Sequence, residues 1–519
     1  MALAGSSLIS SDEGRYASLS LSMLQSGDWI TPRLNGLLYF EKPPLQYWMG
    51  AIAMRSFGVN EFAARLWPGL AGLATVALLG HTARRLWGAS AGWRALCIGA
   101  STTWIAVNSH FLSLDAGLCA ALTLVLSGLL IAEHSRKVSP RSARRWILAA
   151  WVGLALAVLS KGPIGVVTPA VVLMLQSAWR RDFSVWGRLQ WVPGLLIFGV
   201  IAVPWFVMIS AKNPGFASFF FVHEHIDRFL TPVHRREGSW WYFLPFVLVG
   251  FLPWTGALPW LVRSTKGDFA TSLLVIWCVF ILLFFSASSS KLPSYILPMF
   301  PALVLLLVRA LDRASPIALR RHFWVPVVVW GLTLLCVPFA SRFGKGAPPA
   351  AVESLALGVT IGAALFLGTA PLAWRLLSRG NLTATLAALS GAHLAALLIV
   401  MASYNPYGQL KSSDALVRAL TPAIDPQTPV FAVRLYDHTL PFYLRRPVIL
   451  VEHVDEFEFG ESQEPARWIP TLDQFVLRWR SEPRAAAYMN RATFDELLGR
   501  GLAMRVQFED ARRLVVVKP

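Results

Sequence analysis

Long apolar segments separated by short polar turns occupy most of the chain between residues 63 and 402. A helix needs about 20 mainly apolar residues to cross the hydrocarbon core of a membrane, so each segment predicts one membrane helix. The pattern predicts a polytopic α-helical membrane protein with about twelve such helices. The predicted helices are 63–86, 92–108, 113–133, 145–160, 163–178, 190–210, 243–262, 269–286, 292–309, 323–340, 352–374 and 382–402.

A polar and aromatic segment, residues 11–48, stands outside this pattern. Near its start Tyr16, Leu19 and Met23 recur at helical spacing, and Gly27 with Asp28 predicts the end of that helix. Loops carry binding and catalytic residues more often than the elements they connect. We therefore expect the chemistry of the protein in this segment.

The pattern changes again near Tyr404, where short strand-like and helical runs begin. They predict a small α/β domain that caps or docks onto the membrane part. The predicted strands are 428–433, 447–451 and 514–517, and the predicted helices are 472–480 and 493–498. The chain thus divides into a catalytic loop with juxtamembrane helices (1–62), a membrane domain (63–403, with a long loop at 211–242) and an α/β domain (404–519).

Composition and charge support the membrane class. Hydrophobic residues make up 55% of the chain and charged residues only 15%, with a mean hydropathy of +0.52. Much of the net charge of +18 comes from basic residues in alternate loops, which places those loops in the cytoplasm. Membrane lipids are therefore the expected partners of this charge, and nucleic acid is not. The basic loops are those that contain Arg84, Arg136, Arg180, Arg263, Arg309 and Arg375.

The same alternation places residues 11–48, the loop 211–242 and the C-terminal domain on the opposite side of the membrane. No signal peptide precedes residue 11, so we expect that a first membrane helix is missing before Asp12. The four cysteines lie inside apolar segments without metal-ligand spacing, which predicts neither disulfides nor a cysteine metal site.

Three ionisable residues at membrane depth are functional candidates, because charges there are costly. Asp115 either stabilises a helix start or faces the polar segment. Lys161 and Lys291 occupy tight turns next to proline, and each either extends to the interface or points into a cavity. Together with Lys42 and Arg15 they would converge on one face, where they suit an anionic group such as a lipid phosphate.

Two further groups have structural and chemical interpretations. Asp12 is either a helix N-cap or a reactive carboxylate, and Glu13 is an acid in the first helical turn. Glu41, His223 and His225 could bind zinc or another divalent metal, or could simply form hydrogen bonds. Two histidines two positions apart do not share a helix face, which weakens the metal interpretation.

Several motifs resemble those of the aminoarabinose transferases of Gram-negative bacteria, lipid A-modifying members of the protein-mannosyltransferase-like GT-C superfamily. The resemblance extends over the whole membrane domain. The motifs are Asp12-Glu13, Arg15-Tyr16, Gly27-Asp28-Trp29, Gly36, Tyr39-Phe40-Glu41-Lys42-Pro43-Pro44, Ser160-Lys161-Gly162-Pro163, His223-Glu224-His225 and Ser290-Lys291-Leu292-Pro293.

The resemblance implies thirteen membrane helices and a periplasmic C-terminal domain in the bacterial inner membrane. It implies transfer of 4-amino-4-deoxy-L-arabinose from undecaprenyl phosphate to a lipid A phosphate, and with it polymyxin resistance. We expect a monomer that requires no cofactor. The implied catalytic carboxylates are Asp12, Asp115 and Glu13, and the implied phosphate-binding and substrate-binding residues are Arg15, Tyr16, Tyr39, Lys42, Lys161, Lys291 and Tyr295.

The sequence leaves three alternatives open. Asp12 acts as a general base if the acceptor is a hydroxyl, but only orients or stabilises reacting groups if the acceptor is an ionised phosphate. The sugar could be a hexosamine or mannose, and the acceptor a protein. A lipid or sugar transporter is the alternative of another class, although transporters favour charges near the membrane midplane and internal repeats.

Overall fold

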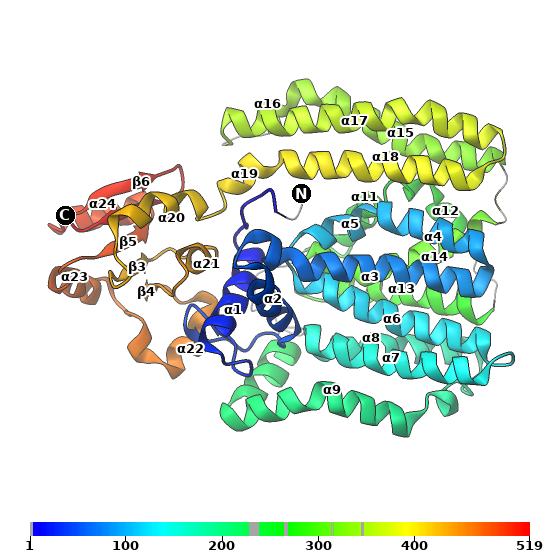
Figure 1. The fold of residues 1–519 in the computed structure, drawn as a ribbon, viewed down its shortest axis with the longest axis horizontal. Coiled ribbons are helices and arrows are strands. Elements are labelled where there is room, and N and C mark those ends of the chain that lie inside the picture. Colours follow the sequence, from blue (N-terminus) through cyan, green and yellow to red (C-terminus); the bar gives the residue numbers. More distant parts are fainter. Residues whose placement is uncertain (1–3, 228–237, 264–267, 313, 315, 344–346) are drawn as a thin grey trace.

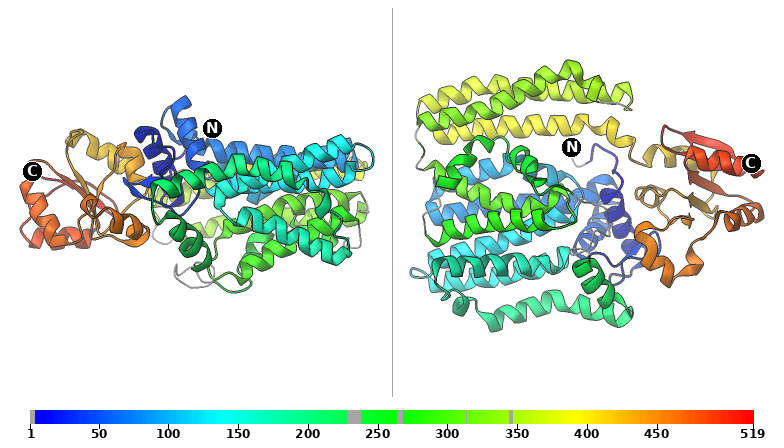
Figure 2. Two further views of the ribbon diagram at one scale, coloured as in Figure 1. Left: turned by 90° about the horizontal axis from the view of Figure 1, so that it is seen from below. Right: turned by 180° about the vertical axis from the view of Figure 1, so that it is seen from behind.

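The structure, a computed structural model, describes residues 4–227, 238–263, 268–312, 314, 316–343 and 347–519. Long helices lie side by side in a bundle, and the C-terminal domain lies beyond one end of it (Figure 1). Two short helices, α1 (Asp12–Ser26) and α2 (Leu45–Phe57), lie between the bundle and that domain, as both views of Figure 2 also show.

In the described ranges, nine helices are long and apolar enough to cross a membrane, and a bent pair adds a tenth. The chain is therefore a multi-pass membrane protein. The nine are α3 (Glu61–Trp87), α6 (Leu114–Ser135), α7 (Pro140–Lys161), α9 (Trp191–Lys212), α13 (Phe269–Ala287), η4 with α14 (Pro293–Leu311), the run Leu319–Arg342 that begins in α15 (Pro316–Cys336), α17 (Pro349–Ser378) and α18 (Leu382–Ser403), which continues into α19 (Asn405–Gln409).

Each of the twelve predicted segments coincides with helix in the structure, and three of them are not a single helix long enough to cross a membrane. Segment 163–178 is α8 (Ile164–Arg180), which is short. Segment 92–108 is broken into α4 (Ala89–Ser101) and α5 (Thr103–His110), because Thr102 has an extended backbone. Segment 243–262 contains the bent pair, in which α11 (Phe243–Gly250) meets the run Thr255–Leu261 at 109°.

The polar segment folds as predicted at its start. Helix α1 ends at Gly27, whose left-handed φ of 71° is easy for glycine. A hairpin follows, in which β1 (Arg33–Leu34) pairs with β2 (Leu37–Leu38) through a two-residue turn with positive φ at Asn35 and Gly36. The chain then passes Glu41 and Lys42 into α2.

The C-terminal domain has both strands and helices, as the sequence predicted, but its mixed sheet has five strands, and the sequence prediction missed β5 and β6. The strand order is β4-β3-β5-β7-β6, in which β3 pairs in parallel with β4 and β5, whereas β7 pairs antiparallel with β5 and β6. The elements are α20 (Asp414–Leu420), β3 (Val430–Val433), α21 (Leu440–Leu444), β4 (Ile449–Val451), α22 (Glu458–Gln463), α23 (Leu472–Ser481), β5 (Ala486–Met489), α24 (Arg491–Gly499), β6 (Arg505–Glu509) and β7 (Leu514–Val517).

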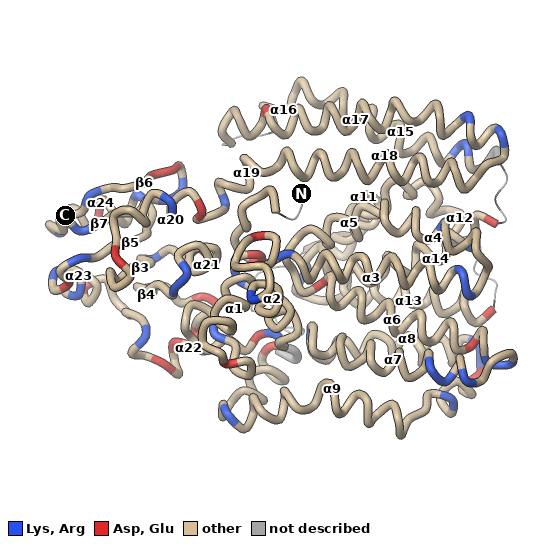
Figure 3. The backbone as a smooth tube through the Cα atoms, in the orientation of Figure 1, with Lys and Arg blue, Asp and Glu red and all other residues tan. Residues whose placement is uncertain are grey.

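Charge is distributed unequally along the bundle. Figure 3 shows Lys and Arg gathered at the end of the bundle that is far from the C-terminal domain. Some of them pair with acidic residues there, as Arg309 does with Asp268 at 2.8 Å. The loops that the sequence predicted to be basic therefore lie together at one end of the bundle.

Candidate active site

A cavity of about 790 Å³ is lined by residues of α1, of the loop before α2, of the C-terminal domain and of the ends of membrane helices. Both polar and apolar side chains line it, and they come from seven separate parts of the chain. Its lining residues are Asp12, Arg15, Tyr16, Glu41, Lys42, Ser113, Leu114, Asp115, Lys161, Phe219, His223, Glu224, Leu292, Tyr295, Val454, Asp455, Glu456, Glu458, Phe459 and Ser462.

Lysines that the sequence placed in separate loops line this cavity together, and each is held by a carboxylate. Lys42 Nζ lies 3.0 Å from Glu224 Oε2. Lys161 Nζ forms an ion pair with Asp115 and lies 4.3 Å from the centre of the Tyr295 ring. A cation over an aromatic face is attracted by the ring, so Tyr295 supports the position of Lys161.

Arg15 joins the same cavity from α1. Its Nη1 donates to Asp12 Oδ1 at 2.8 Å, and its Nε lies 2.8 Å from Glu456 Oε2. The Asp12 side chain is 36% exposed, and Ser11 occupies the N-cap position of α1. The capping interpretation of Asp12 is therefore wrong, since this carboxylate faces the cavity and binds Arg15.

Asp115 both stabilises the start of a helix and faces the polar segment, so its two interpretations agree. It lies in the first turn of α6, where the helix dipole favours a carboxylate, and it lines the cavity opposite Lys161.

Three of the predicted site residues do not line the cavity. Glu13 is 1% exposed, and its carboxylate accepts from Arg65 Nη2 at 2.6 Å and from the Leu112 backbone N at 3.0 Å. Lys291 is buried and donates to the Gly238 carbonyl at 2.8 Å. Tyr39 is buried within the protein, and this burial raises the pKa of its phenol well above the usual value.

An apolar groove of about 260 Å³ continues from the polar cavity along the membrane helices. Four residues belong to both spaces: Lys42, Lys161, Glu224 and Tyr295. The cations therefore lie at the junction of a polar chamber and an apolar channel. The remaining residues of the groove are Leu118, Leu122, Pro163, Ile164, Val167, Thr168, Ile281, Phe284, Phe285, Ser288, Ser290 and Pro298.

The predicted metal ligands are placed only in part. Glu41 and His223 line the cavity, whereas the side chain of His225 lies outside the described residues. The pKa of Glu41 is raised above its ordinary value. Burial and the neighbouring Glu224 carboxylate raise it by more than Lys42 lowers it. Over the described residues, no group of three or more His, Cys, Asp or Glu side chains is arranged to hold a metal, so this site stays a prediction.

Sequence reasoning missed the contribution of the C-terminal domain. Glu456, just after β4, contacts both Arg15 and His438. Burial raises the pKa of Glu456, but its contacts with Arg15 and His438 outweigh burial and lower it to about 2. The signal was present in Asp455-Glu456-Phe457-Glu458, an acidic and aromatic run beyond the carboxyl end of a parallel strand, where ligand sites are common.

Two family models match this chain, one over its N-terminal part and one over the C-terminal domain. Residues 11–220 match the dolichyl-phosphate-mannose-protein mannosyltransferase family. Residues 416–518 match the aminoarabinose transferase C-terminal domain.

Curated relatives agree with these matches. An undecaprenyl phosphate-alpha-4-amino-4-deoxy-L-arabinose arabinosyl transferase 2 of Pseudomonas fluorescens is 34% identical over 315 residues, which are 59% of this chain and 53% of that protein. The corresponding transferase of Pseudomonas aeruginosa strain UCBPP-PA14 is 34% identical over 60% of this chain and 57% of its own length. The chain thus spans about half the length of the curated relatives it matches.

Two solved structures match over the full chain. The crystal structure of ArnT from Cupriavidus metallidurans bound to undecaprenyl phosphate has a TM-score of 0.95 and 34% identity, with 100% of this chain and 95% of that chain covered. The apo form of the same protein has a TM-score of 0.94 and 35% identity at the same coverage. On this evidence, the chain belongs to the aminoarabinose transferase family, with the GT-C fold.

Proposed function

We propose that this protein transfers 4-amino-4-deoxy-L-arabinose from undecaprenyl phosphate to a phosphate of lipid A. The observation that carries the proposal is the junction at Lys42, Lys161 and Tyr295, where a polar cavity opens into an apolar groove. A lipid-linked sugar phosphate has the same division into a polar head and an apolar chain. The names of the relatives, and the undecaprenyl phosphate in the solved structure, supply the identity of the donor.

The cations act on the departing phosphate. As the bond between the anomeric carbon and the phosphate oxygen breaks, that oxygen retains the electron pair and gains negative charge. Lys42 and Lys161, whose side chains are mostly buried, stabilise this charge in a site partly shielded from solvent. Their present partners, Glu224 and Asp115, hold both ammonium groups in position until the donor phosphate binds.

Asp12 lines the same cavity as the two lysines and acts on the acceptor or the sugar. Arg15 holds its Oδ1, and Oδ2 accepts no hydrogen bond from the described residues. A lipid A phosphate has a second pKa of about 6 and is largely ionised at neutral pH, so it attacks without losing a proton. Asp12 therefore orients the acceptor or stabilises positive charge at the anomeric carbon, and a general base is needed only for a hydroxyl acceptor.

The charge distribution supports a location in the inner membrane with the cavity facing the periplasm. Lys and Arg gather at the end of the bundle far from the C-terminal domain, whose residues help to line the cavity, and basic loops favour the cytoplasmic side. Both the lipid donor and lipid A would then reach the cavity from the membrane. We expect the protein to act as a monomer, because residues from seven separate parts of one chain line the cavity.

Mass spectrometry of lipid A tests the proposal in cells. Cells that express the gene should contain lipid A carrying aminoarabinose, and cells in which it is deleted should lack this species. Lipid A that is the same in both strains, while the donor lipid is present, would contradict the proposed acceptor.

A further inference from the structure

We propose that Glu456 of the C-terminal domain is a positioning residue of the active site, which acts through Arg15 on Asp12. The inference rests on the proposed function, because it assigns Asp12 to the transfer reaction. It means that the C-terminal domain completes the catalytic site and does more than cover it.

The contacts form a continuous chain from one domain to the other. Glu456 Oε2 lies 2.8 Å from Arg15 Nε, while its Oε1 contacts His438 Nε2. Arg15 then donates to Asp12 at 2.8 Å. The side chains of Arg15 and Glu456 are each 11% exposed, so loss of either residue removes one of the two partners of a largely buried charge.

Helix α1 and the C-terminal domain meet backbone to backbone at this point. A Cβ on Gly14 would lie 2.5 Å from the Thr439 backbone N and 2.6 Å from the His438 carbonyl carbon, so only glycine permits the contact. Ser18 Oγ donates to the His438 carbonyl at 2.8 Å on the same face of α1. The glycine next to Arg15 therefore allows the domain to bring Glu456 and His438 to the arginine.

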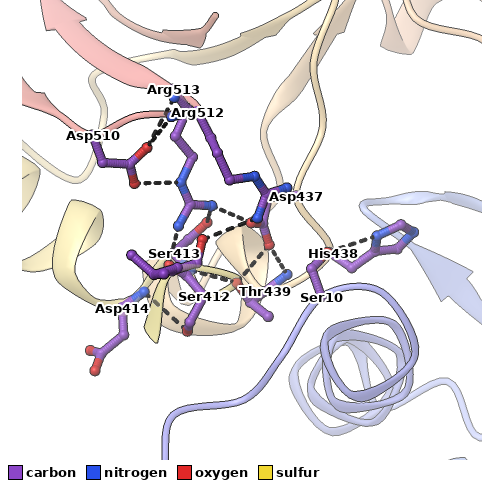
Figure 4. A network of polar contacts seen from close by, with 11 residues as sticks. Ser10, Ser412, Ser413, Asp414, Asp437, His438, Thr439, Asp510, Arg512 and Arg513 are labelled. Carbon is purple, nitrogen blue, oxygen red and sulfur yellow. Dashed lines mark hydrogen bonds and ion pairs between the residues drawn. The ribbon is translucent and has the colours of Figure 1, made fainter. Parts of the chain in front are cut away.

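The turn that carries His438 is fixed from within its own domain. Figure 4 shows Arg513 reaching from the sheet to Asp437, and these two buried side chains form an ion pair. Asp437 Oδ1 accepts from the Thr439 backbone N at 2.8 Å. His438 Nδ1 lies 3.4 Å from Ser10 Oγ, so both ring nitrogens of this histidine have partners, and the ring is held against Glu456.

A positioning role differs from simple docking in a way that a matched control reveals. Glu464 also belongs to the C-terminal domain and forms an ion pair across the same boundary, with Arg33 at 2.9 Å. It does not line the cavity. Removing its charge weakens docking alone, whereas removing the charge of Glu456 also releases Arg15.

The test uses full-length protein in lipid nanodiscs, with steady-state transfer measured for wild type, Glu456→Gln, Glu456→Asp and Glu464→Gln. Misplacing a reacting group by about 1 Å costs about 100-fold in rate, so we expect Glu456→Gln to lower kcat by about 10- to 100-fold. The KM for the donor should change less than about threefold, because Lys42 and Lys161 are unaltered. Glu456→Asp should recover part of kcat, and Glu464→Gln should stay within about threefold of wild type.

The inference is overturned if Glu456→Gln keeps more than about a third of wild-type kcat, or if Glu456→Gln and Glu464→Gln lose activity equally. If the wild-type protein transfers no sugar, the proposed function fails, and a structure of the Glu456→Gln variant decides the inference. With α1 in place, the Arg15 guanidinium should have left Asp12. An unchanged contact between Arg15 and Asp12 would overturn the positioning role.

Discussion

Two neighbouring carboxylates in α1 have opposite surroundings. Asp12 faces the cavity, whereas Glu13 is buried and bound by Arg65 from α3. Consecutive helical residues point in different directions, so at most one of this pair can face a given site. The sequence could not decide which one, because both acids suit the first turn of a helix equally well.

Asp12→Asn should abolish transfer while the protein remains folded and inserted. Asparagine has the same shape and keeps a hydrogen-bond acceptor for Arg15, but it lacks the negative charge that the reaction requires. Lipid A from cells that express the variant should carry no aminoarabinose, with the protein present at wild-type amount. Near-normal modification would show that the carboxylate has no chemical role.

Glu13→Gln should act on stability. Removing one partner of a buried ion pair typically costs about 3–5 kcal/mol, and Glu13 and Arg65 form such a pair, with side chains 1% and 3% exposed. Thermal unfolding of the purified variant should therefore begin well below that of wild type. A variant that is as stable as wild type but inactive would indicate that Glu13 takes part in the reaction.

Lys161→Ala should weaken use of the donor by about ten- to a hundredfold, since losing a charge-assisted contact costs about 1.5–3 kcal/mol. Lys161→Arg should recover only part, because a planar guanidinium does not replace a compact ammonium at the Gly162-Pro163 corner. Titration of the donor in the transfer assay measures both effects. Donor use by Lys161→Ala equal to wild type would remove Lys161 from the phosphate site.

At the scale of elements, hydropathy predicted every apolar helix but none of the irregularities. The break at Thr102 and the bend near Pro253 arise from local backbone geometry and packing, to which a count of apolar residues is insensitive. Lys291 was predicted in the cavity because its tight turn resembles that of Lys161, yet its ammonium binds the Gly238 carbonyl. The position of the Lys291 ammonium is thus set by a contact with a distant segment, which the local sequence does not show.

Gly14→Ala should separate the C-terminal domain from α1, because the new methyl group would overlap the backbone of His438 and Thr439. We expect lower thermal stability and loss of transfer, with normal membrane insertion. Gly499→Ala in the same domain is the control, since a Cβ there has no atom within 4 Å. Equal behaviour of the two variants would contradict the close packing.

At the scale of the whole molecule, the two domains form one site. The sequence predicted the membrane bundle, the α/β domain and the convergence of Arg15, Lys42 and Lys161. It did not predict that Glu456 would enter the cavity, because a local acidic run does not show which residue more than 400 positions away it contacts. Residues on both sides of the domain boundary therefore form the candidate active site.

Acid should weaken the contact between the domains. The pKa of Glu456 is lowered from about 4.5 to about 2, so its contribution to stability is complete above pH 4.5 and is lost as the pH falls towards 2. A shift of this size corresponds to about 3 kcal/mol. The difference in thermal stability between wild type and Glu456→Gln should shrink over this range, and a difference independent of pH would contradict the ion pair.

The most direct measurement is sugar transfer by the purified protein in nanodiscs, supplied with the undecaprenyl phosphate-linked aminoarabinose donor and lipid A. Mass spectrometry should detect lipid A with one added aminoarabinose when wild type is present, and none with Asp12→Asn. Folded wild-type protein that leaves lipid A unmodified, or an Asp12→Asn variant that modifies it as well as wild type, would contradict the proposed transfer and its site.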